Sequence, residues 1–435
     1  MTSRTTSPTL RPAVFLPRKW CSRIIADPAR WTGPAFETFE TDTIAVTRPV
    51  DGHVCALSYS PLARDLVQSD LLDMPVAQAY EYIGPGDVAH LSGEAHKATR
   101  VLLSTTLDTV LGAVGAAMLK QEVTRACTLI SCTGMARADL PELDLLRITR
   151  RVFYSTMLTA LAPGGSGHDI PGILGLCDTI ASEPLNPITS DPVGFDRNSR
   201  KEPASAGARA SLNRHWSSVL IESDGVIPRI YRDPALFALQ APLIDSVDRE
   251  RYFASFLTSL LLSVEPVAKA AASTLEYSLR GGFLDPRPEF PGVIRRSPPV
   301  PFITREVRDG SSFTGPRREV QVAPNLSLRS GDRLVLHLPS IFNHDPHAPY
   351  QDAFGVGAHR CIGSSVAVTF LRASLEPLFK ALCSMMAAPT SKPGVVKLDL
   401  DTARRLRAAM KRAPSLPAPS TPPVPVVPTW PNAWP

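Results

Sequence analysis

The ten residues FGVGAHRCIG, positions 354–363, constrain the fold of this chain more than any other segment. Cys361 follows a glycine-rich turn and directly precedes an apolar stretch, SSVAVTFLRASLEPLFKAL, which predicts a helix. A thiolate there would face backbone N–H groups, and these donors and the helix dipole both lower the pKa of a cysteine. Gly355, Gly357 and Gly363 leave room for a flat, bulky group beside the backbone. The segment predicts a thiolate ligand at a helix start, with a structural cysteine in a glycine-rich turn as the alternative.

A lone thiolate with no second cysteine nearby suits the axial position of a haem iron. The segment resembles the haem-binding loop of the cytochrome P450 monooxygenases, Phe-Gly-x-Gly-x-His-x-Cys-x-Gly, with six positions matched in one ungapped run. This resemblance implies a mainly α fold with a small β region, and haem b whose iron is bound by Cys361. It also implies that four further residues of the loop contact the cofactor: Phe354, Gly355, His359 and Gly363.

The composition indicates an ordinary globular protein. The chain has 435 residues, of which 44% are hydrophobic, and this is ample for a large core. The formal net charge of +5 is mild and the basic residues are scattered, so nothing supports nucleic-acid binding. Seven cysteines without a CxxC or metal-ligand spacing indicate reduced thiols, and we expect a cytoplasmic protein. Because no stretch approaches 18 uninterrupted apolar residues, we expect no membrane anchor.

Three regions are expected along the chain. Residues 1–30 are predicted to be a flexible basic leader, with an organellar presequence as the alternative, because the first 26 residues hold five basic and no acidic residues. Residues 31–412 would form one haem-thiolate domain, as the resemblance implies. Residues 413–435 contain nine prolines and predict a disordered tail. The polar segment 196–210 is expected to be a surface loop.

The segment LSGEAHKATRVLLSTTL, residues 91–107, predicts a helix with one apolar face, because Leu103 and Leu107 recur at helical spacing. His96 and Arg100 are four residues apart and therefore neighbours on that helix. Two cationic donors presented together suit an anion such as a haem propionate. The resemblance implies this role for both residues, and the alternative is a solvated pair on an amphipathic helix.

Residues 245–279 predict the longest helix of the chain. The resemblance implies that it lies over the distal face of the haem and carries an acid followed by a threonine, which deliver protons to bound oxygen. Here Glu265 stands for the acid and Pro266 replaces the threonine, so the helix is expected to open or kink. Glu265 is the predicted catalytic acid–base, and the alternative is an i,i+4 ion pair with Lys269.

Two further departures from the family pattern follow. The segment FPGVIRRSPPVPFITR, residues 290–305, resembles the family's Glu-x-x-Arg helix and the strand after it, with Arg295 as the arginine but Gly292 in place of the glutamate. Arg305 falls where the family has a propionate-binding arginine. Residues 328–346 predict a strand by their alternating leucines, and the segment from there to the cysteine loop is about half as long as usual.

These features favour P450-type monooxygenation, by hydroxylation or oxidative coupling, of a small apolar specialised metabolite. Electrons would come from NAD(P)H through a ferredoxin or flavoprotein reductase that docks near Cys361, where Arg360 and Arg372 could contribute. One alternative is a peroxide-using or oxygen-independent haem-thiolate enzyme, such as a peroxygenase, isomerase or dehydratase, which Pro266 motivates. Another is a degenerate, non-catalytic haem-binding homologue.

Overall fold

We describe the chain from a computed structural model. The residues described are 72–73, 85–88, 91, 93–108, 115–135, 142–161, 170–182, 204–223, 226–233, 249–300, 302–307, 319–323, 326–329, 333–337, 347–357, 360–384, 387–389 and 393–398. The predicted leader (1–30), the predicted tail (413–435) and His359 lie outside these ranges.

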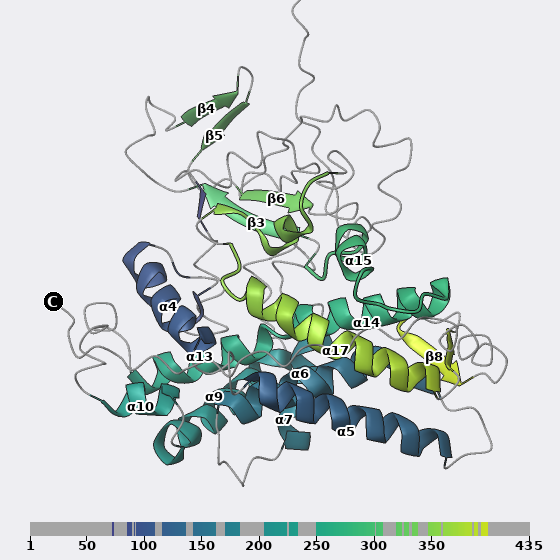
Figure 1. Cartoon of the computed structure of the whole chain (residues 1–435). Helices are drawn as coiled ribbons and strands as arrows, with labels where there is room; N and C mark the ends of the chain where they lie inside the picture. Colours follow the sequence, from purple (N-terminus) through teal and green to yellow (C-terminus); the bar gives the residue numbers. More distant parts are fainter. Residues whose placement is uncertain are drawn as a thin grey trace, which may run out of the picture.

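Helices dominate the described residues (Figure 1). The helices are α4 (Gly93–Thr106), α5 (Gly115–Met135), α6 (Leu145–Leu161), α7 (Ile170–Ser182), α9 (Ala204–Glu222), α10 (Val226–Arg232), α13 (Arg249–Leu262), α14 (Glu265–Gly281), α15 (Phe290–Arg296), the 3-10 helix η4 (Tyr350–Phe354) and α17 (Ser364–Ser384). The strands are β1 (Leu72–Asp73), β2 (Glu142–Asp144), β3 (Phe302–Val307), β4 (Glu319–Ala323), β5 (Leu326–Arg329), β6 (Arg333–His337), β7 (Ala387–Pro389) and β8 (Val395–Leu398). The predicted fold class, mainly α with a small β region, is confirmed.

Four helices form the central packing unit. α5 packs against α6 and α17, and α14 packs against the same two helices, so the four close into a ring. Phe153 of α6 and Phe370 of α17 stack inside it with ring centroids 6.4 Å apart. Ala268 and Ala271 of α14 are fully buried. The hydroxyl of Thr149 donates to the carbonyl of Ala268 at 2.9 Å, because small side chains on α14 let α6 approach closely.

From Arg249 onward, the long helix predicted over residues 245–279 is present as α13 and α14, with a break at Ser263 and Val264. Residues 245–248 lie outside the described ranges. The predicted effect of Pro266 is confirmed. Pro266 lies in the first turn of α14, where a missing N–H costs least. The span 249–281 is long and apolar enough to cross a membrane, but 67% of its apolar window is buried inside the molecule, as in a core helix.

The strands among the described residues form three small antiparallel sheets, with strand orders β1-β3-β6, β2-β8-β7 and β4-β5. β3 and β6 pair from Phe302 opposite His337 to Glu306 opposite Arg333. This pairing confirms the strand predicted from the alternating leucines and the strand expected after α15. In Figure 1 the β3–β6 sheet lies above the N-terminal end of α17, and β8 lies near its C-terminal end.

The loop predicted over residues 196–210 was wrong for its last seven residues, because α9 begins at Ala204. Residues 196–203 lie outside the described ranges. The buried residues Ala208, Leu212, Trp216 and Leu220 follow one another at four-residue spacing. This stripe packs on α13, and tertiary packing of such a face stabilises a helix more than local propensity does. The small and polar residues at its start concealed it in the sequence.

Gly86 joins residues 85–88 to α13. Its N–H donates to the hydroxyl of Ser255 at 2.7 Å. A Cβ at this position would lie 2.1 Å from the carbonyl oxygen of Tyr252 and 2.6 Å from the amide nitrogen of Phe256. Backbone atoms cannot rotate aside, so Gly86→Ala must separate the segment from α13. We expect the free energy of unfolding, measured by urea denaturation, to fall by about 3 kcal/mol or more.

A matched control exists on α7. A Cβ at Gly175 would meet nothing within 4 Å. We therefore expect Gly175→Ala to leave stability unchanged or raise it by up to about 1 kcal/mol, as for alanine in an exposed helix. A Gly86→Ala protein as stable as the Gly175→Ala protein would contradict the described contact.

Candidate functional site

A short closed loop presents Cys361. The N–H of Cys361 donates to the carbonyl oxygen of Phe354 at 2.8 Å, which joins the two ends of the loop. Gly355 and Gly357 have φ angles of 82° and 73°, in the region that L side chains rarely adopt. α17 begins at Ser364, so the sulfur lies just ahead of a helix N-terminus. The predicted position of Cys361 directly ahead of a helix is confirmed.

The expected lowering of the Cys361 pKa is corrected. Cys361 keeps an exposed surface. Protein packed around the sulfur nevertheless raises the pKa of the thiol above its ordinary value by desolvation. The N–H of Gly363 and the charges of Arg100 and Arg360 lower it, but by less than burial raises it. The sequence shows the hydrogen-bond donors near Cys361, but it does not show how much protein packs around the sulfur and desolvates it.

α4 and Leu107, the residue that follows it, lie against this loop. Nη1 of Arg100 donates to the carbonyl oxygen of Arg360 at 2.9 Å. A Cβ on Gly363 would come within 3.8 Å of the side chain of Leu107 and 4.0 Å of the sulfur of Cys361. The structure therefore places Arg100 and Gly363 close to Cys361, while their contacts with a haem remain predictions. The contact of Arg100 with a backbone carbonyl of the loop was not expected.

Two other predicted cofactor-binding residues, His96 and Arg305, are buried. His96 lies one turn before Arg100 on α4, and its side chain is buried. Arg305 lies in β3 and is also buried, at 4% exposure. Their proposed contacts with a propionate remain predictions, as does that of His359.

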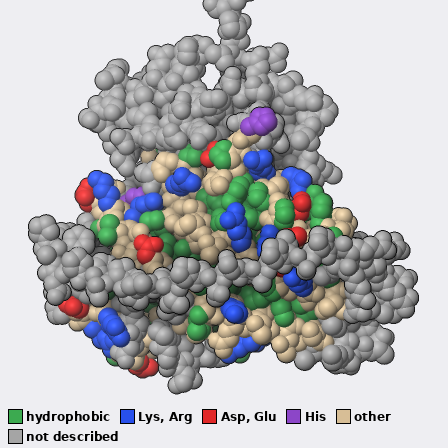
Figure 2. Space-filling view, in the orientation of Figure 1, with side chains coloured by type: hydrophobic (Ala, Val, Ile, Leu, Met, Phe, Trp, Pro, Cys, Tyr) green, Lys and Arg blue, Asp and Glu red, His purple; other side chains and the backbone are tan. Residues whose placement is uncertain are grey.

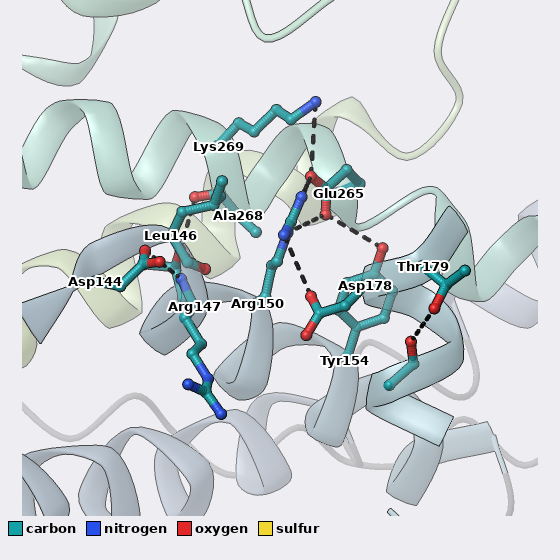
Figure 3. Close-up of polar contacts among 12 residues, drawn as sticks. Asp144, Leu146, Arg147, Arg150, Tyr154, Asp178, Thr179, Glu265, Ala268 and Lys269 are labelled. Atoms are coloured by element: carbon teal, nitrogen blue, oxygen red, sulfur yellow. Dashed lines mark hydrogen bonds and ion pairs between the residues drawn. The ribbon is translucent and has the colours of Figure 1, made fainter. Parts of the chain in front are cut away.

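Glu265, the predicted catalytic acid, lies in an ionic cluster in the first turn of α14 (Figure 3). Nε of Arg150 donates to both carboxylate oxygens, at 3.1 and 2.9 Å, and Nη2 donates to Oε1 at 2.6 Å. The hydroxyl of Tyr154 donates to Oε2 at 3.3 Å, and Nζ of Lys269 lies 3.6 Å from Oε1. The Glu265 side chain is 8% exposed and that of Arg150 is 15% exposed.

The cluster joins three helices, because Nη1 of Arg150 also donates to Asp178 of α7 at 3.2 Å (Figure 3). Burial alone would lower the pKa of Arg150. The hydrogen bonds and charge of Glu265, with smaller effects from Asp178 and Tyr154, outweigh burial and raise this pKa above its ordinary value. Burial raises the pKa of Tyr154 well above its usual value, so its hydroxyl stays protonated and can donate. These contacts favour the ion-pair alternative for Glu265, while its catalytic role stays a prediction.

Sequence reasoning missed Arg150, Tyr154 and Asp178. Arg150 and Tyr154 are four residues apart on α6, which is a signal for a shared helix face. Nothing local connects that face to an acid 115 residues further along the chain.

The donors around Cys361 fit a haem. Within the described parts of the chain, no group of three or more His, Cys, Asp or Glu side chains could hold a metal ion, whereas structural zinc usually takes four such ligands. One thiol, glycines with positive φ and the guanidinium of Arg100 suit a flat, anionic cofactor with one axial ligand. On the face shown in Figure 2, basic side chains are spread among acidic ones rather than gathered in one patch.

No protein-family model and no curated protein matches this chain. Solved structures do match. P450BioI, in complex with an acyl carrier protein ligated to hexadec-9Z-enoic acid, is 12% identical with a TM-score of 0.62, over 87% of this chain and 100% of that one. CYP109E1 of Bacillus megaterium, in complex with testosterone, is 13% identical with a TM-score of 0.55, over 89% and 100%. P450EX alpha (CYP152N1), with myristic acid, is 14% identical with a TM-score of 0.57, over 85% and 90%.

Proposed function

We propose that this chain, which has the cytochrome P450 fold, is a haem-thiolate oxidoreductase with Cys361 as the iron ligand. The observation that supports this most is the closed loop that presents Cys361 at the start of α17. A bound haem with a thiolate ligand supplies oxygen or peroxide activation, because the electron-rich sulfur favours O–O cleavage.

We infer that the other residues of the site bind and orient the cofactor. Arg100 holds the loop through the carbonyl of Arg360, and its charge would favour an anionic group of the cofactor. The proposed cofactor-binding residues are His96, Arg100, Arg305, Phe354, Gly355, His359 and Gly363.

Our leading reaction is monooxygenation of a small apolar metabolite. Electrons would come from NAD(P)H through a separate ferredoxin or flavoprotein reductase, in a cytoplasmic protein. The three matched structures hold an acyl chain, a steroid and a fatty acid, and this supports a largely apolar substrate.

A second candidate is a peroxide-using or oxygen-independent reaction. Two observations favour it: Pro266 offers no hydroxyl, and both oxygens of Glu265 accept hydrogen bonds from Arg150. A carboxylate held in this way is poorly placed to pass protons to a bound oxidant.

The oxidant can be tested directly with haem-loaded protein, using testosterone and myristic acid as probes. One arm supplies hydrogen peroxide alone, and the other supplies oxygen, NADPH, a ferredoxin and its reductase. The leading proposal predicts product only in the second arm, and Cys361→Ala should remove it. Product with peroxide alone would favour the second candidate. No product in either arm, with an intact thiolate spectrum, would leave the non-catalytic alternative.

A further inference from the structure

The two elements that flank the cysteine loop both contact one aromatic ring, Phe290 of α15. η4 precedes the loop, and its first residue, Tyr350, packs edge to face on Phe290, with centroids 5.4 Å apart and ring planes at 84°. α17 follows the loop, and the guanidinium of Arg372 lies over the Phe290 ring, 5.8 Å from its centroid. Phe290 is 1% exposed, so its position is fixed by the core around it.

A short rigid path leads from Tyr350 to the sulfur. η4 is a single 3-10 helix from Tyr350 to Phe354, and it is closed by the N–H of Gly355 on the carbonyl of Asp352 at 3.0 Å. The carbonyl of Phe354 then accepts the N–H of Cys361. A displacement of Tyr350 is therefore passed through one helical turn to the backbone of the cysteine.

The segment just ahead of α15 is joined to α17 by an ion pair. Nη1 of Arg287, just ahead of α15, lies 2.6 Å from Glu376 of α17. Asp285 accepts from Arg287 at 3.0 Å and 2.8 Å and holds its side chain in place. α15 and the segment before it therefore contact both η4 and α17, the elements at the two ends of the loop.

α15 has Gly292 where the family pattern has a glutamate. A Cβ at this position would meet only Nη2 of Arg296 within 4 Å, at 3.7 Å. We propose that Phe290 and Tyr350 are positioning residues for Cys361, and that their ring contact sets the distance between η4 and α17. The inference rests on the proposed haem-thiolate function, since it concerns how that ligand is held. Aromatic pairs in this edge-to-face arrangement are favourable beyond their buried area, so the contact has a preferred geometry.

The test compares the carbon monoxide difference spectrum of four haem-loaded proteins. Tyr350→Leu removes the ring, whereas Tyr350→Phe keeps it and removes only the hydroxyl. Phe283→Leu is the matched control, because it removes a ring pair of the same 5.4 Å separation at the end of α14. We expect Tyr350→Leu to lose more than half of the thiolate-type band relative to wild type. Tyr350→Phe and Phe283→Leu should both keep it.

Two results would overturn the proposal: a full thiolate band in Tyr350→Leu, or an equal loss in Phe283→Leu, which would indicate general destabilisation. If Tyr350→Leu does not fold, Arg372→Met tests the same ring from α17, where residue 372 is exposed. A smaller but measurable loss is then expected, and no loss would overturn the inference. Absence of the band in the wild-type protein would instead contradict the haem-thiolate function itself.

Discussion

Cys361→Ala is expected to abolish the thiolate-type carbon monoxide band and to lower turnover by more than about 100-fold. Loss of a residue that only supports a metal ligand already costs 10–100-fold, and loss of the ligand itself should cost more. Cys361 keeps an exposed surface, so the free energy of unfolding of the haem-free protein should change by no more than about 0.5 kcal/mol. Absorption spectroscopy and urea denaturation measure the two effects separately.

Cys127→Ala is the matched control. Cys127 lies on α5, and its thiol faces the carbonyl of Pro377, 3.6 Å away on α17. The Cys127→Ala variant should keep the carbon monoxide band and the turnover of the wild-type protein. The structural-cysteine alternative predicts the reverse pattern for Cys361→Ala, with lower stability and an unchanged haem spectrum.

Glu265→Gln is expected to lower the free energy of unfolding by about 3 kcal/mol. It leaves the guanidinium of Arg150, which is 15% exposed, without its bidentate carboxylate, and removing one partner of a buried ion pair is strongly destabilising. Asp178 is a weak substitute because its side chain is 49% exposed. Urea denaturation at neutral pH gives the value.

An exposed ion pair provides the control. Lys97 and Glu94 lie 2.6 Å apart on α4, with side chains 71% and 75% exposed. We expect Glu94→Gln to change stability by less than about 1 kcal/mol, as for solvent-exposed pairs. If Glu265→Gln is no more destabilising than Glu94→Gln, the buried cluster does not stabilise the fold as described.

The same cluster can separate the two roles considered for Glu265. Arg150→Met combined with Glu265→Gln should be less destabilising than the sum of the single changes, because the two side chains are in direct contact. If turnover and the free energy of unfolding fall and recover together across these variants, Glu265 affects turnover only by stabilising the fold. If turnover stays low where stability is recovered, Glu265 has a catalytic role.

Patterns among residues close together in the sequence predicted much of the fold. The spacing of leucines predicted α4 and β6, and the proline after Glu265 predicted the break between α13 and α14. The glycines and the cysteine predicted the loop ahead of α17. Each of these features depends on residues within a few turns of one another, where helix periodicity and proline sterics act.

The contacts that the sequence did not predict join distant segments. Gly86 meets Ser255, 169 residues later, and Arg150 meets Glu265, 115 residues later. The start of α9 was missed because its apolar stripe is stabilised by α13 rather than by its own composition. The pKa of Cys361 was predicted in the wrong direction for a related reason, since desolvation depends on everything packed around the sulfur.

The central claim is that Cys361 binds a haem iron as a thiolate. The carbon monoxide difference spectrum of the reduced, freshly purified, haem-loaded protein tests it most directly. We predict the red-shifted thiolate band in the wild-type protein and its complete loss in Cys361→Ala. A haem-loaded protein that lacks this band, with a spectrum that Cys361→Ala does not change, would contradict the claim.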